Sequence, residues 1–280
     1  MFGLLFGLLG KKQASFDNTE EYRLTLGEHL DELRVRIIRV LVMLIVGWVA
    51  GWYILPSLYA FLNNMVAVNI TQALDGKAPF SDVFRNATDP FMLKFRLSFM
   101  LGLIMVFPFC LLQIWGFIAP GLKPNERKPI ERLAPWTLIL FVMGAGFCWV
   151  IIPSALQWFA QYVLEFPGTG LMQEPGAMIF FVLKMMLAFG LGFQLPVVVY
   201  ALGSIGLLKS ETLLQYWRQW ATAVFLAAAI LTPSNDAFSM LMMAVPLVIL
   251  FAISVVLVTA VQKKQKREQE KRDADEAYVS

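Results

Sequence analysis

The sequence has 280 residues, of which 58% are hydrophobic and 15% charged, and its mean hydropathy is +0.65. Soluble domains are closer to half apolar and a quarter charged, so this composition excludes an ordinary soluble protein. The net charge is only +3, and apolar runs of membrane-spanning length recur along the whole chain, which predicts an all-α polytopic membrane protein without a separate soluble domain.

The N-terminal segment, residues 1–24, begins with an apolar stretch that is too short to span a membrane and that ends in two lysines. Its charges follow the apolar core, whereas those of a secretory signal precede it, so we interpret the segment as an interfacial or disordered leader. From Thr25 the pattern becomes helical. Thr25 and Glu28 match a capping box, and apolar residues then recur every three or four positions, so this helix is expected to lie along the membrane before turning into it.

Six apolar segments are predicted to span the membrane within a transmembrane domain of residues 25–261. The segments are approximately residues 37–55, 91–118, 133–164, 176–205, 217–231 and 238–261. The first is expected to end at Pro56, and the mixed stretch that follows is expected to contain a short helix. The last two are short: residues 217–231 would extend roughly 22 Å as a helix, against about 30 Å for the hydrocarbon core. Residues 262–280 form a charged tail that we expect to be disordered.

Basic residues alternate between the two sides of this arrangement. They are concentrated before the first span, after the second, around the loop after the fourth, and in the C-terminal tail. The other loops carry few. Because loops rich in Lys and Arg stay in the cytoplasm, we predict six spans with both termini cytoplasmic.

The loop after the second span, residues 117–128, is the candidate working surface. It interrupts the apolar sequence with Pro120, Gly121 and Pro124 and then with a charge cluster that contains Glu126. Proline and glycine restrict the shape of a loop, which favours a built surface. The alternative is a plain turn whose Lys and Arg only set the topology.

Two carboxylates, Glu32 and Glu126, fall on the predicted cytoplasmic side. Brought together, they could bind a cationic ligand, and arginine suits such a site because its planar fork can bond a carboxylate through two N–H groups. The alternative is that each carboxylate pairs internally with Arg34, Arg36 or Arg127.

Two polar residues lie within or between the later spans. Gln194, beside Pro196 in the fourth span, either faces a partner or water or makes a hydrogen bond between helices of the bundle. Asp236 lies in the turn between the last two spans and is interpreted as a turn cap. The two cysteines lie in apolar runs and His29 is the only histidine, so we predict no metal site, no cofactor and no enzymatic activity.

Taken in order, these motifs resemble TatC, the multispanning receptor family of the twin-arginine protein translocase, over about residues 26–261. The resemblance rests on the following motifs: His29-Leu30-x-Glu32-Leu33-Arg34-x-Arg36, Asp89-Pro90-Phe91 with Lys94, Gln113-x-Trp115-x-Phe117-Ile118-Ala119-Pro120-Gly121-Leu122 with Glu126-Arg127, Phe189-Gly190-x-x-Phe193-Gln194-Leu195-Pro196, and Thr232-Pro233 followed by Asp236.

The resemblance implies a cupped six-helix bundle in a bacterial inner membrane. Such a protein receives folded proteins whose signal peptides carry paired arginines, and the proton gradient drives their export without a nucleotide. It implies single-span partners of the TatA and TatB type and self-association, with membrane lipid around it and no nucleic acid.

The resemblance also suggests roles for individual residues. Glu32 and Glu126 match the carboxylates implicated in recognition of the paired arginines. The neighbouring recognition positions are Arg34, Phe117 and Arg127. Gln194 matches an intramembrane position that is glutamate in some members; its neutral amide cannot release a proton but can dock a partner's polar group. Pro120, Pro196 and Asp236 are structural positions.

Two other function classes were weighed against this one. A secondary transporter of small solutes usually has internal repeats and paired broken helices at the midplane, and the sequence has no convincing repeat. A membrane-embedded enzyme needs clustered nucleophiles or metal ligands at membrane depth. The ligand distinguishes the three classes: a paired-arginine peptide, a small solute or a hydrolysable substrate.

Overall fold

The computed structural model describes residues 26–122, 124–232 and 236–279. The predicted leader, the Thr25 half of the capping box and Lys123 lie outside these residues. The helices are α2 (Leu26–Leu74), α3 (Asp89–Ile118), α4 (Pro124–Gln161), α5 (Ala177–Gly192), α6 (Leu195–Ser204), α7 (Ser210–Gln215), α8 (Trp217–Leu231) and α9 (Ala237–Val279), with short 3-10 helices at Ala119–Gly121 and Tyr162–Glu165.

Five helical segments of the described chain are long and apolar enough to cross a membrane: Gly27–Leu74, Asp89–Gly121, Leu133–Glu165, Ala177–Ser204 and Ala237–Lys271. Four of the six predicted spans lie within these segments, and a fifth, 176–205, differs from Ala177–Ser204 by one residue at each end. The sixth, α8, has 15 residues and is shorter than an ordinary membrane-crossing helix. The protein is therefore an all-helical membrane protein built on five long apolar helices.

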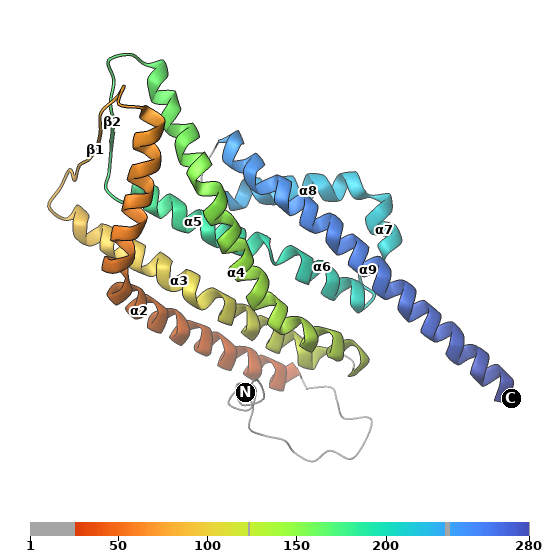
Figure 1. Ribbon diagram of the computed structural model, residues 1–280. Helices are drawn as coiled ribbons and strands as arrows, with labels where there is room; N and C mark the ends of the chain where they lie inside the picture. Colours follow the sequence, from red (N-terminus) through yellow and green to blue (C-terminus); the bar gives the residue numbers. More distant parts are fainter. Residues whose placement is uncertain (1–25, 123, 233–235, 280) are drawn as a thin grey trace.

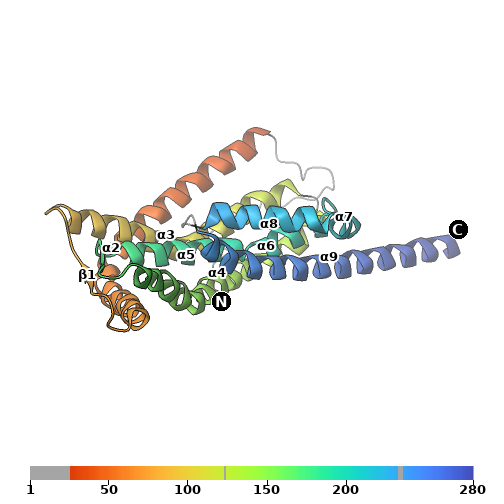
Figure 2. The same cartoon turned by 90° about the horizontal axis from the view of Figure 1, so that it is seen from above.

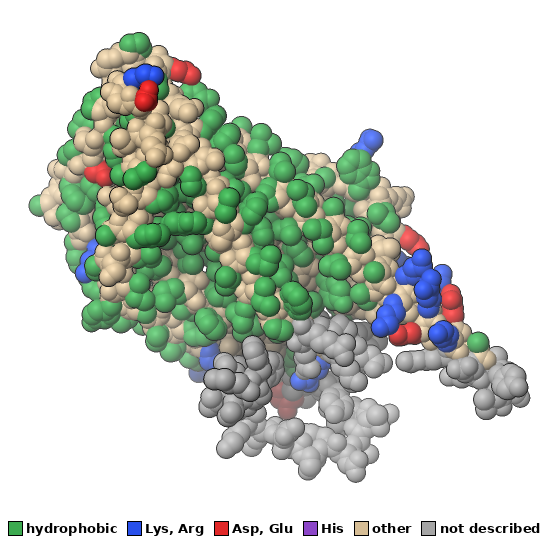
Figure 3. All heavy atoms as spheres, in the orientation of Figure 1, with side chains coloured by type: hydrophobic (Ala, Val, Ile, Leu, Met, Phe, Trp, Pro, Cys, Tyr) green, Lys and Arg blue, Asp and Glu red, His purple; other side chains and the backbone are tan. Residues whose placement is uncertain are grey.

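Hydrophobic side chains are spread over the flank of this bundle in the view of Figure 3, and many large ones are exposed. In a water-soluble protein such a surface would be costly, but it suits a bundle surrounded by lipid tails. A group of charged side chains gathers along the C-terminal half of α9, beyond the apolar flank.

Helix α2 continues for 18 residues beyond Pro56, where the first span was expected to end. Its two halves run in different directions (Figures 1 and 2). A proline inside a helix removes one backbone hydrogen bond and bends the axis without stopping the helix. The second half buries Leu62, Val66, Ile70 and Leu74, four residues apart on one face, in the core shared with α4 and α5. This burial explains why the mixed stretch forms a long helix.

Helices α2 and α3 approach each other closely through small residues. A Cβ atom added at Gly102 of α3 would overlap the backbone of Gly47, and one added at Gly51 would overlap the carbonyl oxygen of Ser98. Without a hydrophobic driving force inside a bilayer, helices associate largely through such close packing. This contact holds the start of α2 beside the end of α3 and so positions the site described below.

Two three-residue strands, β1 (Phe80–Asp82) and β2 (Leu171–Gln173), join the loops at one end of the bundle. They pair in parallel, with Phe80 opposite Leu171 and Asp82 opposite Gln173. A hydrogen bond of 3.0 Å from Gln157 Nε2 of α4 to Asn69 Oδ1 of α2 lies at the same end. Runs of three residues are too short to produce a readable alternation, so the sequence did not predict these strands.

The predicted fourth span is divided into α5 and α6. Pro196 occupies the first turn of α6, where the absent backbone N–H is not needed for helix bonding. Gln194 lies at the junction between the two helices. The break therefore places a polar side chain at the point where the regular backbone pattern is interrupted.

The expectation of a disordered tail at residues 262–280 is wrong for the residues described, since α9 remains helical to Val279. Its far end projects beyond the other helices (Figures 1 and 2). Gln262 contributes to the fold: its Nε2 donates to Gly203 O at 2.9 Å and to Leu208 O at 2.7 Å, and its Oε1 accepts from Ser210 N at 2.8 Å. These bonds tie the loop between α6 and α7 to α9.

Candidate functional site

The first turns of α2 hold an ion pair between two of the motif residues. Arg36 lies one helical turn after Glu32, and its Nε donates to Glu32 Oε1 at 3.0 Å, while Nη2 donates to the same oxygen. Side chains four apart on a helix face are neighbours, which explains the pairing locally. The Arg36 and Glu32 side chains are 20% and 26% exposed, so both remain partly accessible.

The Arg36 guanidinium also reaches the end of α3. Its Nη2 donates to Gly116 O at 2.8 Å, and Nη1 lies 3.4 Å from both the backbone oxygen and the side-chain Oε1 of Gln113. The last carbonyls of a helix lack helical partners and carry the negative end of its dipole, so a cation is favoured there. Gly116 leaves room for this contact, because a Cβ at that position would overlap Arg36 Nη1.

An aromatic stack lies beside the ion pair. The rings of His29 and Phe117 are 4.3 Å apart between centroids and inclined by 15°. His29 Nδ1 lies 4.0 Å from Glu32 Oε2, which is too far for a hydrogen bond. The structure thus brings two predicted site residues, Glu32 and Phe117, to the same surface, with His29 between them.

The loop that follows α3 starts from this surface. Pro120 lies in a single 3-10 turn, Ala119–Gly121, and α4 begins at Pro124. Glu126 belongs to the first turn of α4, but its side chain lies outside the described residues, so the meeting of the two carboxylates stays a prediction. Arg34 and Arg127 both have exposed side chains.

Gln194 is buried at 7% exposure and bridges two helices. Its Nε2 donates to Thr137 O of α4 at 3.2 Å and to Gly190 O of α5 at 3.3 Å. This is the helix–helix hydrogen bond that the sequence allowed as one of two interpretations. Among the described residues, the hydrogen bonds of the Gln194 side chain join α4 and α5 and do not reach the surface around Glu32.

Asp236 lies immediately before α9 and caps its first turn. Its Oδ1 accepts a hydrogen bond of 2.7 Å from Ser239 N, which satisfies one of the free N–H groups at a helix start. This geometry is the turn cap that the sequence suggested.

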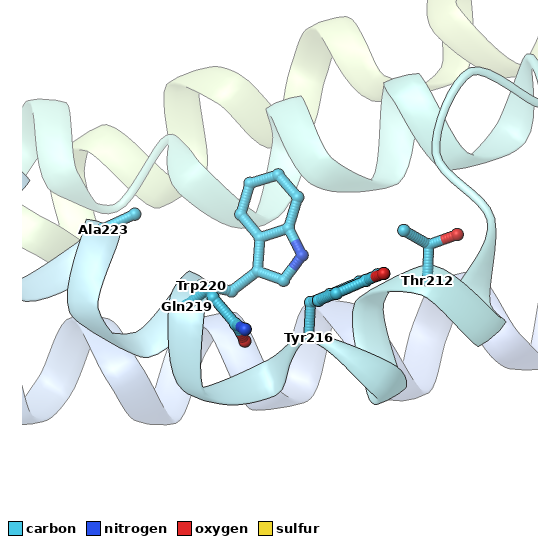
Figure 4. Close-up of a pocket in the computed structure, with 5 residues that line it drawn as sticks. All are labelled: Thr212, Tyr216, Gln219, Trp220 and Ala223. Carbon is cyan, nitrogen blue, oxygen red and sulfur yellow. The ribbon is translucent and has the colours of Figure 1, made fainter.

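A separate shallow pocket of about 360 Å³ lies on α7 and α8. It is lined by Thr212, Tyr216, Gln219, Trp220 and Ala223 (Figure 4). Its lining is mainly apolar, and none of the predicted site residues contributes to it. Trp220 is held by stacking on Phe251 of α9, with ring centroids 6.2 Å apart.

The sequence motifs include Gln113 and Arg36, but they assign no role to Gln113 or Gly116 and suggest Arg36 only as an internal partner of Glu32. The four-residue spacing of Glu32 and Arg36 was a readable signal. The roles of these two positions on α3 could not be read from the sequence, because they come from a backbone carbonyl, an amide and an absent side chain that face a helix about 80 residues earlier in the chain.

The comparisons with known proteins agree on one family. The model of the family "Sec-independent protein translocase protein (TatC)" matches residues 28–246. A TatC of Carboxydothermus hydrogenoformans is 37% identical over 248 residues, covering 88% of this chain and 97% of that protein. One of Xylanimonas cellulosilytica is 32% identical, covering 82% and 81%.

A crystal structure of the twin-arginine translocase receptor TatC superimposes with a TM-score of 0.68 at 28% identity. The match covers 84% of this chain and the whole of the other. The residues matched by the family model include the start of α2 and the end of α3, which build the surface around Glu32. This chain belongs to the TatC family of Sec-independent protein translocase proteins.

Proposed function

We propose that this chain, a receptor subunit of the twin-arginine translocase and not an enzyme, binds the paired arginines of signal peptides at the surface formed by the start of α2 and the end of α3. One observation carries the proposal: the Glu32 carboxylate lies next to the carbonyl end of α3 and already holds a guanidinium group there. The same surface suits an arginine brought by another peptide.

The chemistry of this surface favours arginine over lysine. A guanidinium offers five N–H donors in a flat fork, so it can bond a carboxylate and a neighbouring carbonyl at once. An ammonium is a compact charge that makes fewer simultaneous bonds. In this proposal Glu126 supplies a second carboxylate for the second arginine, while Arg34, Phe117 and Arg127 contact the rest of the peptide.

We propose six spans with both termini in the cytoplasm. Basic residues at the start of α2, at the start of α4 and along the end of α9 support this orientation. In this arrangement α8 crosses the membrane despite its 15 residues, and the bilayer thins around it, as it does around short apolar helices. The bundle would then form a cup in a bacterial inner membrane.

The remaining family roles are proposed in the same way. The chain would work in a complex with single-span subunits of the TatA and TatB type and with further copies of itself, and the proton gradient would drive export of folded cargo. Gln194 would dock a polar group of a partner helix. A polar side chain at membrane depth is costly unless it is paired, and this amide is paired with Thr137 O and Gly190 O, so a partner's polar group would have to replace these bonds.

Binding of a labelled signal peptide with paired arginines, compared with its paired-lysine twin, tests the proposed site. The purified protein in detergent is expected to prefer the arginine peptide. Glu32→Ala and Glu126→Ala should each weaken that binding by about tenfold or more, because a charge-assisted hydrogen bond contributes about 1.5–3 kcal/mol. Membrane insertion and yield of both variants should stay unchanged.

Asp75→Asn provides a control, since it removes an exposed carboxylate from the opposite end of the described bundle and asparagine tolerates the left-handed backbone there. Unchanged affinity in both glutamate variants would eliminate the carboxylate site. If the two peptides bind equally, the measurement is repeated with the single-span partners present. Absence of an arginine preference there as well would show that the receptor proposal for this surface is wrong.

A further inference from the structure

We propose that Arg36 occupies the guanidinium position of the receptor site as an internal stand-in, and that an arginine of the signal peptide replaces it there. The inference rests on the function proposed above and specifies how that site is kept closed before a peptide arrives. In this inference Arg36 weakens signal-peptide binding, because it occupies the position that the arginine of the peptide needs.

The position occupied by the Arg36 guanidinium has the features of a built site. Four acceptors surround it: Glu32 Oε1, Gly116 O, Gln113 O and Gln113 Oε1, at the distances given above. They come from two helices and include a buried amide, Gln113, at 8% exposure. A flat fork of N–H donors satisfies such a set, and a point charge does not.

Gly116 shapes the position. A side chain there would fall on the guanidinium nitrogen Nη1, so the α3 backbone itself forms one wall. The stacked pair of His29 and Phe117 lies beside the carboxylate. The space therefore accepts one guanidinium, and a second one can enter only when Arg36 leaves.

The contacts of Arg36 are of a kind that can be exchanged. Both members of its ion pair are partly exposed, and partly exposed pairs contribute little to stability because water and salt compete for the charges. The two contacts with Gln113 are at 3.4 Å, near the limit of a hydrogen bond. An incoming arginine makes the same bonds, so the exchange leaves no acceptor unpaired.

Arg36→Gln tests the exchange, because it removes the internal competitor and leaves every acceptor in place. We expect the arginine peptide to bind about three- to tenfold more tightly to this variant, in line with the small contribution of partly exposed pairs. Arg39→Gln, one turn further along α2, controls for the loss of one positive charge and should change binding by less than about twofold. The gain should vanish in Glu32→Gln/Arg36→Gln.

Gly116→Ala tests whether the two guanidinium groups share one position. The added methyl group blocks that position for either arginine, so the peptide should bind at least about tenfold more weakly, including in an Arg36→Gln background. Gly146→Ala is the matched control, since a Cβ at Gly146 meets no atom within 4 Å. If Arg36→Gln does not yield folded protein, Arg36→Lys serves instead. The gain in peptide affinity should then be smaller, because lysine keeps the positive charge and loses only the planar set of N–H donors.

The results separate this inference from the proposed function. A preference for the arginine peptide in the unmodified protein, with unchanged or weaker binding in folded Arg36→Gln, would overturn the exchange and leave the receptor site standing. No arginine preference in the unmodified protein, with or without its single-span partners, would overturn both.

Discussion

Polar side chains in this apolar protein serve groups that the helices themselves cannot satisfy. Arg36 supplies donors to the last carbonyls of α3, and Asp236 accepts from the first turn of α9. Gln194 spans the gap between α4 and α5 at the break before α6. In a membrane each such group would otherwise remain unpaired at considerable cost, so single residues decide how helix ends are arranged.

Gln194→Leu separates the two roles open to this residue. Loss of the amide should lower the free energy of unfolding by only about 1 kcal/mol, since a hydrogen bond between membrane helices contributes about that much or less. Co-purification of the single-span partner should fall more than signal-peptide binding. The comparison uses detergent-solubilised protein, with thermal unfolding followed in parallel.

Gln157→Leu is the matched control for that experiment, because it also removes a glutamine that links two helices. It should reduce stability by a similar amount and leave the partner bound. Equal co-purification of the partner with Gln194→Leu and the unmodified protein would show that Gln194 only holds the bundle together.

At the scale of the elements, hydropathy located the helices, and contacts between them decided where they end. The predicted span 91–118 lies within α3, and 133–164 lies within α4 and the 3-10 helix Tyr162–Glu165 that follows it. Pro56 bends α2 without ending it, because the residues beyond it are buried against α4 and α5. Similarly, the charged tail is a continuation of α9. Its first residue, Gln262, makes hydrogen bonds that hold the loop between α6 and α7 in place.

The close contact between α2 and α3 at Gly47 and Gly102 gives a prediction at this scale. Gly102→Ala places a methyl group against the rigid backbone at Gly47, where no side chain can move aside. We expect the free energy of unfolding to fall by about 1–3 kcal/mol, as in other overpacked sites. Arginine-peptide binding should weaken too, since this contact supports the surface around Glu32.

Thermal unfolding in detergent and peptide binding check this prediction together, with Gly146→Ala as the control. Gly146 lies on an open face of α4, so alanine there should leave both measurements nearly unchanged. A stable Gly102→Ala protein with normal peptide binding would mean that α2 and α3 can separate without consequence for the site.

At the scale of the whole molecule, the number of membrane crossings decides on which side each loop of the bundle lies. Five helices of the described chain are long enough to cross the membrane, whereas α8, with 15 residues, is shorter than that length. A sixth crossing by α8 would place the turn before α9 outside and the end of α9 inside. A five-span arrangement would place the two ends of the chain on opposite sides.

Single-cysteine variants labelled with a membrane-impermeant maleimide decide between these arrangements. With Cys110 and Cys148 replaced, Lys77→Cys and Ala237→Cys should label in intact spheroplasts, and Lys264→Cys only after the membrane is opened. Lys77 and Lys264 have side chains 66% and 78% exposed, and Ala237 is exposed, so all three sites are accessible to the reagent. Labelling of Lys264→Cys from outside would contradict the six-span topology.

The sequence by itself determined the class of protein, the approximate position of its spans, the family and the candidate residues. This information is local: apolar length, proline and glycine positions, the distribution of Lys and Arg and short motifs can all be read along the chain. The spacing of Glu32 and Arg36 belongs to the same kind of information, since residues four apart share a helix face.

Only the tertiary structure decided which groups meet. The three-residue strands β1 and β2, the contact of Gly102 with Gly47 and the approach of Arg36 to Gln113 and Gly116 join segments far apart in the sequence. Each depends on the direction of a backbone or on the absence of a side chain, neither of which produces a periodic pattern. Such contacts form because buried polar groups must find partners and because close-packed helices leave room for only one arrangement.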